Sequence, residues 1–183
     1  MKKIIAVFVF LTLVVGCAPT RKLVTLNVDP NEAIVIGRLS VSYNGEDVTQ
    51  KVTLFFNEIM WGKYSYKTDE TGYIFTYLPL GKNHFARIAY KDFIYNFPKD
   101  YATFDLTTNS AVNYIGDLKV EWNGPKFKMP NMFGMLGALA DEAVNDGKIE
   151  ITVLNKSKEC KEIFDKHYPN QMGLREELVK IKK

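Results

Sequence analysis

The sequence predicts a mainly β protein: a β-sandwich with a helical insertion and an α-helical C-terminal extension. Between Ala33 and Trp122, short runs rich in Val, Ile, Thr, Tyr and Phe are bounded by Gly, Pro, Asn or Asp, as strands are. These runs recur at a spacing of roughly 8–12 residues, which is typical of sandwiches. The chain of 183 residues is also long enough to bury the core of one domain.

The expected strands follow one another through this region. The first, AIVIGRLSVSY, begins at Ala33 and runs into Asn44-Gly45-Glu46-Asp47, a strong turn signal. The following runs are KVTLFFNE, KYSYKT, GYIFTYLP, HFARIAY, FIYNF, ATFDLT and VNYIGDLKVEW.

The most informative stretch is TDETGYIFTYLPLG, from Thr68 to Gly81. Gly72 permits a positive φ angle, and Pro79 marks the end of a strand because it cannot donate a ladder hydrogen bond. The stretch resembles the T-D-x-x-G-x-[FY]-x-x-x-L-P-x-G signature of transthyretin-like and carboxypeptidase-regulatory-like sandwiches, and Gly37 sits where that family often has G-x-[VL]. The resemblance covers about half of the chain. It implies an Ig/transthyretin-like β-sandwich and no activity.

After Trp122 the pattern changes. A helix is expected from Met132 to Val144, with an apolar face and with Gly147 well placed to end the segment. KIEITVLN then alternates as a strand, and the tail from Ser157 to Lys183 predicts one or two amphipathic helices separated by Pro169-Asn170. Residues 124–183 are therefore interpreted as an α/β extension packed on a sandwich of residues 33–123.

The N-terminus indicates export. Met1-Lys2-Lys3 precedes the uncharged run from Ile4 to Val15, which is shorter than the roughly 20 residues of a membrane-spanning helix but fits a secretory signal. The run ends in Val14-Val15-Gly16-Cys17, which resembles the lipobox of bacterial lipoproteins. A buried cysteine in an N-terminal core helix, or an uncleaved anchor helix, are the alternatives.

The lipobox resemblance implies cleavage between Gly16 and Cys17, attachment of diacylglycerol to the Cys17 thiol, and acylation of the new amine, for example with palmitate. Two or more acyl chains anchor a protein stably, so the membrane would be a partner through Cys17. Residues 1–16 would be the signal peptide and residues 17–32 a lipidated tether, with a strand as the alternative near Leu23. Ala18 favours the outer membrane, on its periplasmic or surface face, if the cell is Gram-negative.

Charge and cysteine content narrow the choice of partners. Cleavage leaves 183 − 16 = 167 residues with 22 basic and 21 acidic side chains, so the mature chain is nearly neutral and no nucleic-acid partner is expected. Cys160 is then the remaining thiol. The spacing in SKECKEIFDKHYP places Cys160, Ile163, Phe164 and His167 on one helix face, which indicates a packed thiol rather than an intermolecular disulfide.

The sequence carries no motif for catalysis, a metal or a cofactor. The two histidines, His84 and His167, lack metal-ligand spacing, and a general base formed by His84 with Asp92 or Asp105 is a minor alternative. A metal cluster of carboxylates from Asp47, Asp69 and Glu70 is not expected, because the D-x-D-x-D-G run of a calcium site is absent. Hydroxyisourate hydrolases share the transthyretin-like fold, but their C-terminal Tyr-Arg-Gly-Ser is replaced here by VKIKK.

Aromatic residues are the remaining candidates for recognition. Trp61, Tyr95 and Tyr101 are expected to form a binding surface if they are exposed, whereas core packing is the ordinary role of such rings. The sequence therefore predicts a lipid-anchored envelope protein that is not an enzyme and acts as a structural or interaction module with an envelope protein partner. The alternative is a lipoprotein that binds a glycan or another ligand through exposed aromatic residues.

Overall fold

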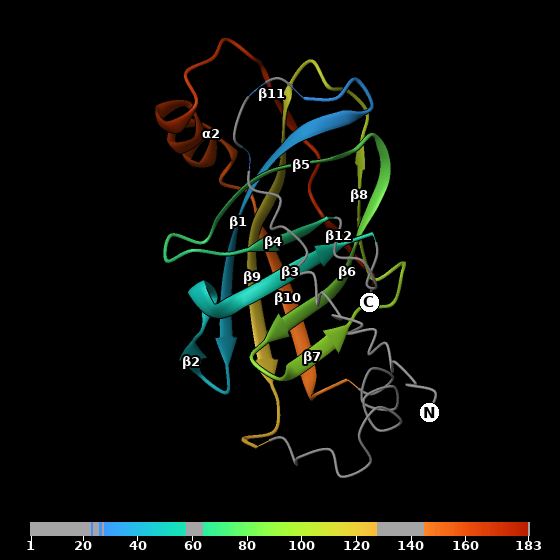
Figure 1. Ribbon diagram of the computed structural model, residues 1–183, viewed down its shortest axis with the longest axis vertical. Helices are drawn as coiled ribbons and strands as arrows, with labels where there is room; N and C mark the ends of the chain where they lie inside the picture. Colours follow the sequence, from blue (N-terminus) through green and yellow to red (C-terminus); the bar gives the residue numbers. More distant parts are fainter. Residues whose placement is uncertain (1–22, 24–25, 27, 58–63, 128–144, 183) are drawn as a thin grey trace, which may run out of the picture.

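The computed structural model describes residues 23, 26, 28–57, 64–127 and 145–182. The protein is mainly β and contains two sheets, an arrangement consistent with the expected sandwich (Figure 1). The strands are β1 (Glu32–Tyr43), β2 (Glu46–Asp47), β3 (Val52–Phe56), β4 (Ser65–Lys67), β5 (Tyr73–Pro79), β6 (Gly81–Tyr90), β7 (Phe93–Asn96), β8 (Ala102–Leu106), β9 (Val112–Asn123), β10 (Lys148–Leu154), β11 (Leu174–Glu176) and β12 (Lys180–Ile181). The 3-10 helix η1 (Thr49–Lys51) and the α-helix α2 (Ser157–His167) complete the described elements.

Every strand predicted from a sequence run is present, with its ends shifted by a few residues at most. The helix predicted from Met132 to Val144 lies outside the described residues, so the helical insertion stays a prediction. No helix in the described part of the chain is long and apolar enough to cross a membrane.

The first sheet is built around two long strands, β1 and β9, which run parallel from Val35 opposite Asn113 to Tyr43 opposite Trp122. Strand β9 pairs with β11 along its first residues and with β10 along the rest, while β1 pairs with β5 and then with β2. The parallel register shifts after Ile36, where a β-carbon on Gly37 would lie 3.0 Å from the carbonyl oxygen of Gly116. Glycine at position 37 therefore lets the two central strands approach closely.

The second sheet has the order β12-β8-β6-β3-β4, and β7 also pairs with β6. In Figure 1 this sheet lies in front of the first, and its strands β3 and β6 cross β1 and β9 steeply. The pairing of β3 with β6 is interrupted by a bulge between Phe55 and Phe56.

The first half of strand β1, from Ala33 to Gly37, is buried on both faces, which explains the continuous apolar run from Ala33 to Ile36. Val35 and Val41 belong to the main core, together with Leu54 of the second sheet. Ile34 and Ile36 belong to a second core on the opposite face, together with side chains of β5, β9 and α2. Figure 1 shows α2 beside the upper part of β1.

The C-terminal segment differs from its prediction. Helix α2 buries Cys160 and Phe164 on one face, as the spacing indicated, but the segment after Pro169 forms strands β11 and β12, so the second helix is wrong. The backbone amide of Val179 donates to Ile115 of the first sheet, and the amide of Lys182 donates to Tyr101, next to the second. The open edges of β9 and β8 thus determine an extended conformation in a segment whose residues favour helix.

The turn in TDETGYIFTYLPLG has the predicted geometry. Gly72 has a φ angle of +69°, and its amide donates to the carbonyl of Asp69. A β-carbon on Gly72 would lie 2.2 Å from the carbonyl oxygen of Leu39, and the Leu39 amide donates to the Gly72 carbonyl at 2.8 Å. Strand β5 ends at Pro79, as predicted.

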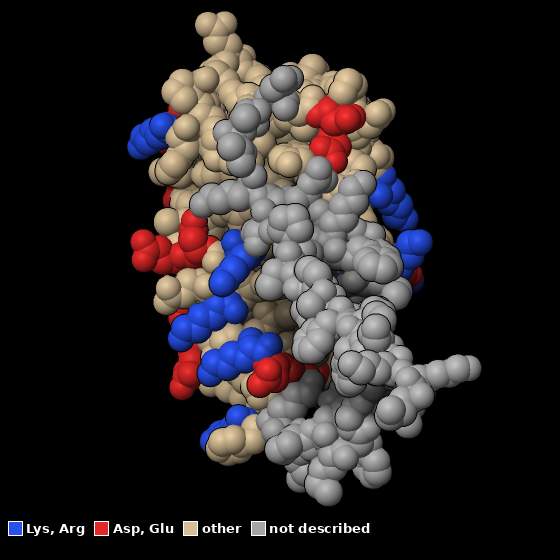
Figure 2. Space-filling view, in the orientation of Figure 1, with Lys and Arg blue, Asp and Glu red and all other residues tan. Residues whose placement is uncertain are grey.

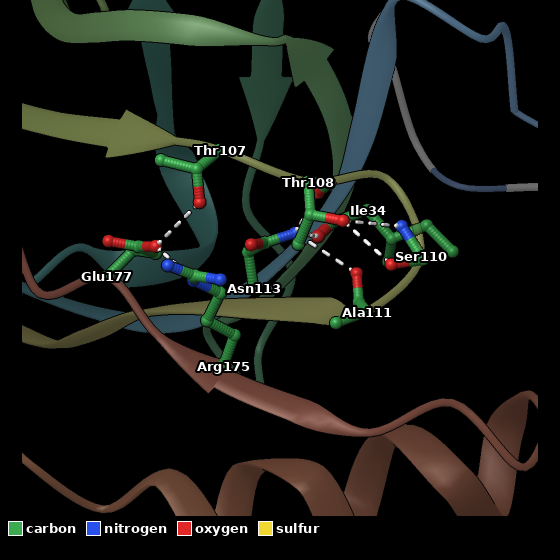
Figure 3. A network of polar contacts seen from close by, with 8 residues as sticks. All are labelled: Ile34, Thr107, Thr108, Ser110, Ala111, Asn113, Arg175 and Glu177. Atoms are coloured by element: carbon green, nitrogen blue, oxygen red, sulfur yellow. Dashed lines mark hydrogen bonds and ion pairs between the residues drawn. The ribbon is translucent and has the colours of Figure 1, made fainter.

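A buried asparagine organises the loop that crosses from β8 to β9. The side-chain amide of Asn113 donates to the carbonyl oxygens of Ile34 at 3.1 Å, Thr108 at 3.1 Å and Ala111 at 3.0 Å (Figure 3). Asn113 is fully buried. One side chain therefore ties the crossing loop to the start of β9 and to the neighbouring strand β1.

Candidate functional site

The structure places only some of the residues that the sequence singled out. Gly16, Cys17 and Trp61 lie outside the described residues. Tyr95 and Tyr101 are half-buried and both pack against Phe97, with ring centroids 5.2 Å and 5.7 Å from the Phe97 ring. The two tyrosines are thus brought together at the edge of the main core, and burial raises the pKa of Tyr101.

The surroundings of His84 are cationic. Its side chain is half-buried in a cleft lined also by Lys82, Lys99 and Asp100. Burial lowers the pKa of His84, and the charges of Lys99 and Lys82 lower the pKa further. Within the described ranges, no three His, Cys, Asp or Glu side chains are grouped as a metal site would require.

A second cleft lies where the β4–β5 turn meets helix α2, and we call it the aromatic cleft. It has a volume of about 300 Å³ and is lined by Tyr66, Asp69, Thr71, Tyr73, Phe75, Ile163, His167 and Tyr168. Strand alternation places Tyr73 and Phe75 on the face of the first sheet that α2 covers, and helical spacing places Phe164 and Tyr168 one turn apart against them. Two segments that are far apart in the chain, residues 66–75 and 163–168, therefore build one site.

The walls of the aromatic cleft are held by ring contacts. Phe75 meets Phe164 at 5.4 Å and Tyr168 at 6.1 Å in edge-to-face geometry, and Tyr73 stacks on Phe75 at 5.8 Å. Such contacts fix the rings more firmly than burial alone. The cleft is thus a preformed apolar surface rather than a loose collection of side chains.

Its polar groups come from the turn and the end of the helix. The carboxylate of Asp69 accepts hydrogen bonds from the Thr71 amide at 3.0 Å and the Thr71 hydroxyl at 2.5 Å. The His167 Nδ1 atom lies 2.9 Å from the carbonyl oxygen of Ile163, and because a carbonyl only accepts, Nδ1 is the donor of this hydrogen bond.

Burial disfavours ionisation of two phenols of the cleft. Burial raises the pKa of Tyr66 to about 12, and its hydroxyl donates to the carbonyl of Tyr73 at 2.9 Å. Burial also raises the pKa of Tyr73, against the opposing effect of Arg38. The cleft therefore offers neutral ring faces beside one carboxylate, which suits binding through stacking and hydrogen bonds.

The chain after the expected lipidation site is attached beside this cleft. Leu23 is 2 % exposed, its amide donates to the Phe75 carbonyl at 2.8 Å, and its carbonyl accepts from the Tyr168 hydroxyl at 2.6 Å. Leu26 and Val28 pack against the same core. Within the expected tether of residues 17–32, the described residues Leu23, Leu26 and Val28 are thus docked on the domain.

Sequence reasoning missed the aromatic cleft. One usable signal was the alternation in TGYIFTY, which places Tyr73, Phe75 and Tyr77 on one face, and another was the spacing of Phe164 and Tyr168 in a helix. Nothing in the sequence, however, indicates that these two faces meet.

Comparison with known proteins adds no relative: no family model, no curated protein and no solved structure matches the chain.

Proposed function

We propose that the protein is a bacterial cell-envelope lipoprotein, anchored by acyl chains on Cys17, whose β-rich domain is a non-enzymatic interaction module held close to the membrane. The Val14-Val15-Gly16-Cys17 sequence after a short apolar run supports the anchor. The Thr68–Gly81 stretch, with its glycine at positive φ and its strand ending at Pro79, supports a transthyretin-like sandwich as the domain. The partner is an envelope protein or glycan, and Ala18 favours the outer membrane.

The docking of Leu23 carries this proposal. Only residues 18–22 separate Leu23 from the lipidated Cys17, and six peptide units span at most about 21 Å when fully extended. The Leu23 contacts to Phe75 and Tyr168 therefore hold the end of the domain that bears β5 and α2 near the bilayer. A short, docked linker positions a module at the surface, whereas a long one would let it diffuse.

The surface supports a partner other than nucleic acid. Figure 2 shows Lys and Arg interspersed with Asp and Glu over the coloured part of one face, and no continuous field of one sign forms there. This pattern agrees with the near-neutral charge of the cleaved chain. A protein that binds nucleic acid uses a basic stripe or patch instead.

Metabolic labelling tests the anchor. Cells that express the chain are grown with labelled palmitate, and the wild type is compared with Cys17→Ser and with Cys160→Ser as the matched control. The wild type and Cys160→Ser should carry the label and sediment with membranes, whereas Cys17→Ser should be an unlabelled, uncleaved precursor. Label in Cys17→Ser equal to that in the wild type would contradict the proposal.

The aromatic cleft favours a second candidate function, binding of a glycan. The C–H faces of a sugar stack on aromatic rings, here Tyr73 and Tyr168, while its hydroxyls can donate to a carboxylate such as Asp69. Envelope oligosaccharides should raise the melting temperature of the full chain in detergent, because a ligand that binds only the folded state stabilises it.

Two alanine variants locate the binding site. Tyr73→Ala should abolish the rise in melting temperature, whereas Tyr95→Ala should retain it because Tyr95 lies away from the cleft, beside Phe97. If the rise in melting temperature is lost in Tyr95→Ala and kept in Tyr73→Ala, the glycan binds beside Tyr95 and Tyr101, and the aromatic cleft is not the glycan site.

A further inference from the structure

A cleft on the second sheet gathers positive charge, and we call it the cationic cleft. It has a volume of about 570 Å³ and is lined by Asn57, Lys82, His84, Lys99 and Asp100. The lining comes from the end of β3, the start of β6 and the loop before β8. The volume is in the range of small-molecule sites, which is roughly 300–1,000 Å³.

The charges around the cationic cleft favour an anion. Lys82 and Lys99 act on His84 strongly enough to lower its pKa, after the larger effect of burial. The carboxylate of Asp100 is already bound by Lys182, which lowers the pKa of Asp100. Asp105, exposed on β8, lies opposite Lys82 in the ladder, so three lysines here face two carboxylates.

The floor of the cleft is fixed by a buried polar network. Asn57 adopts a φ angle of +62°, its amide donates to the His84 carbonyl at 3.0 Å, and its Oδ1 accepts from the His84 amide at 3.0 Å. The Asn57 side-chain amide donates to Asn83 at 2.7 Å, and the fully buried Asn83 donates to Pro79 at 2.9 Å and to Gly81 at 2.8 Å.

This network accounts for an unusual conformation. A non-glycine residue in the left-handed region costs free energy, and a bulge interrupts the pairing of its ladder. Both features recur beside binding sites. The bulge after Phe55 lies directly before Asn57. Together they hold the backbone of His84 in a fixed position between two buried neighbours, Asn83 and Phe85.

We infer that the cationic cleft binds a phosphate monoester group, with Lys82 and Lys99 as charge partners and His84 as a hydrogen-bonding group. Lysine ammonium groups bind phosphate as point charges without demanding a planar geometry. A half-buried imidazole adds a donor that becomes stronger when an anion is near. The group can belong to a lipid headgroup or to a soluble metabolite. The inference does not depend on the lipid anchor or on the aromatic cleft.

The two histidines allow a direct test by NMR on the full chain in nonionic detergent. Inorganic phosphate should raise the pKa of His84 by about 1, because a bound anion favours the imidazolium form. His167, the last residue of α2, lines the aromatic cleft instead, so it serves as the internal control and should respond only to ionic strength. An equal response of His84 to chloride at matched ionic strength would overturn the inference.

Variants show whether the lysines are responsible. Lys82→Gln and Lys99→Gln should each weaken phosphate binding about tenfold, the size expected for one charge-assisted hydrogen bond. Lys148→Gln, an exposed lysine on β10, is the matched control and should leave binding unchanged. Unchanged binding in the double variant of Lys82 and Lys99 would also refute the site.

The source of the phosphate is resolved by two further titrations. One uses phosphatidylcholine vesicles that contain phosphatidic acid, and the other uses soluble glycerol phosphate. A response of His84 to the vesicles alone assigns a headgroup, and a response to glycerol phosphate assigns a soluble ligand. No response in either titration contradicts the inference.

Discussion

The hydroxyl group of Tyr168 donates a 2.6 Å hydrogen bond to the backbone carbonyl of Leu23, a residue 145 positions earlier in the chain. This bond joins the end of helix α2 to the first described residue. Because the Leu23 amide also donates to Phe75 of β5, the N-terminal segment is held between a helix and a strand. The attachment of the chain and the wall of the aromatic cleft therefore share two residues, Phe75 and Tyr168.

Removal of that hydroxyl should release the N-terminal segment. Tyr168→Phe keeps the ring contacts and loses one hydrogen bond, so the free energy of unfolding should fall by about 1 kcal/mol. Protease cleavage near residues 18–28 should become faster. Tyr95→Phe is the control, since its hydroxyl has no hydrogen-bond partner in the described part of the chain. Equal protection in Tyr168→Phe and the wild type would show that packing and the Leu23 amide bond to Phe75 hold the segment without the Tyr168 hydroxyl.

The two glycines at turns should differ in their tolerance of a side chain. Gly45 and Gly72 both have positive φ angles, +87° and +69°, so alanine should cost about 1–2 kcal/mol at either from conformation. A β-carbon at Gly45 meets nothing within 4 Å, whereas one at Gly72 meets the Leu39 carbonyl at 2.2 Å. Gly72→Ala should therefore be the more destabilising by at least about 1 kcal/mol.

Denaturant unfolding of the two variants provides the measurement. Equal loss of stability in Gly45→Ala and Gly72→Ala would mean that the turn at Gly72 shifts away from β1 at little cost, contrary to the close approach described.

The buried amide of Asn113 should be important for stability. Asn113→Ala leaves three carbonyl oxygens without their donor, which should cost roughly 3 kcal/mol, near the upper end for unsatisfied buried groups. Asn109→Ala in the same loop removes one exposed bond to Pro30 and should change stability by no more than about 0.5 kcal/mol. Thermal and denaturant unfolding compare the two, and similar values would refute the tying role of Asn113.

The thiol of Cys160 gives a pH dependence with a defined sign. Burial raises its pKa from 9.0 to about 12. Above pH 9 the unfolded chain loses this proton while the folded chain retains it, so the contribution to stability is complete below pH 9 and is lost as the pH rises towards 12. Between pH 8 and pH 10, the free energy of unfolding should therefore fall less in Cys160→Ala than in the wild type, because the variant lacks the one proton that unfolding releases. Denaturant unfolding at the two pH values provides the measurement.

Alkylation provides an independent check of the same thiol. In the Cys17→Ser background, iodoacetamide at mildly alkaline pH should label Cys160 rapidly in denaturant and very slowly in the native protein. Rapid labelling of the native protein would place the thiol at the surface, against its position on the buried face of α2.

The strands were predictable because each one records its own environment. Alternation in KVTLFFNE and KIEITVLN shows a half-buried strand, and the continuous apolar run around Ile34 to Ile36 shows a strand covered on both faces. Local turn chemistry placed Gly72 and Pro79 correctly. These features depend on a residue and its near neighbours, which one sequence contains.

The pairing of distant segments was not predictable in the same way. The tail from Leu174 contains Glu, Leu and Lys, which favour helix, and only the open edges of β8 and β9 make it extended. The aromatic cleft likewise needs Tyr73 and Tyr168 together, and the cationic cleft needs Lys82 beside Lys99. Sequence reasoning identified His84 but considered carboxylates as its neighbours, because the loop that brings Lys99 is positioned by tertiary structure.

The strands β11 and β12 have a consequence for the order in which the molecule can form. The final ladders of both sheets require residues 174–182, and the central parallel ladder joins segments about 80 positions apart, so most pairing is non-local and slow. A chain threaded through a translocation channel from its N-terminus cannot complete these ladders until residues 174–182 have emerged. On the proposed export route, both sheets would therefore be completed only after this segment has crossed the membrane.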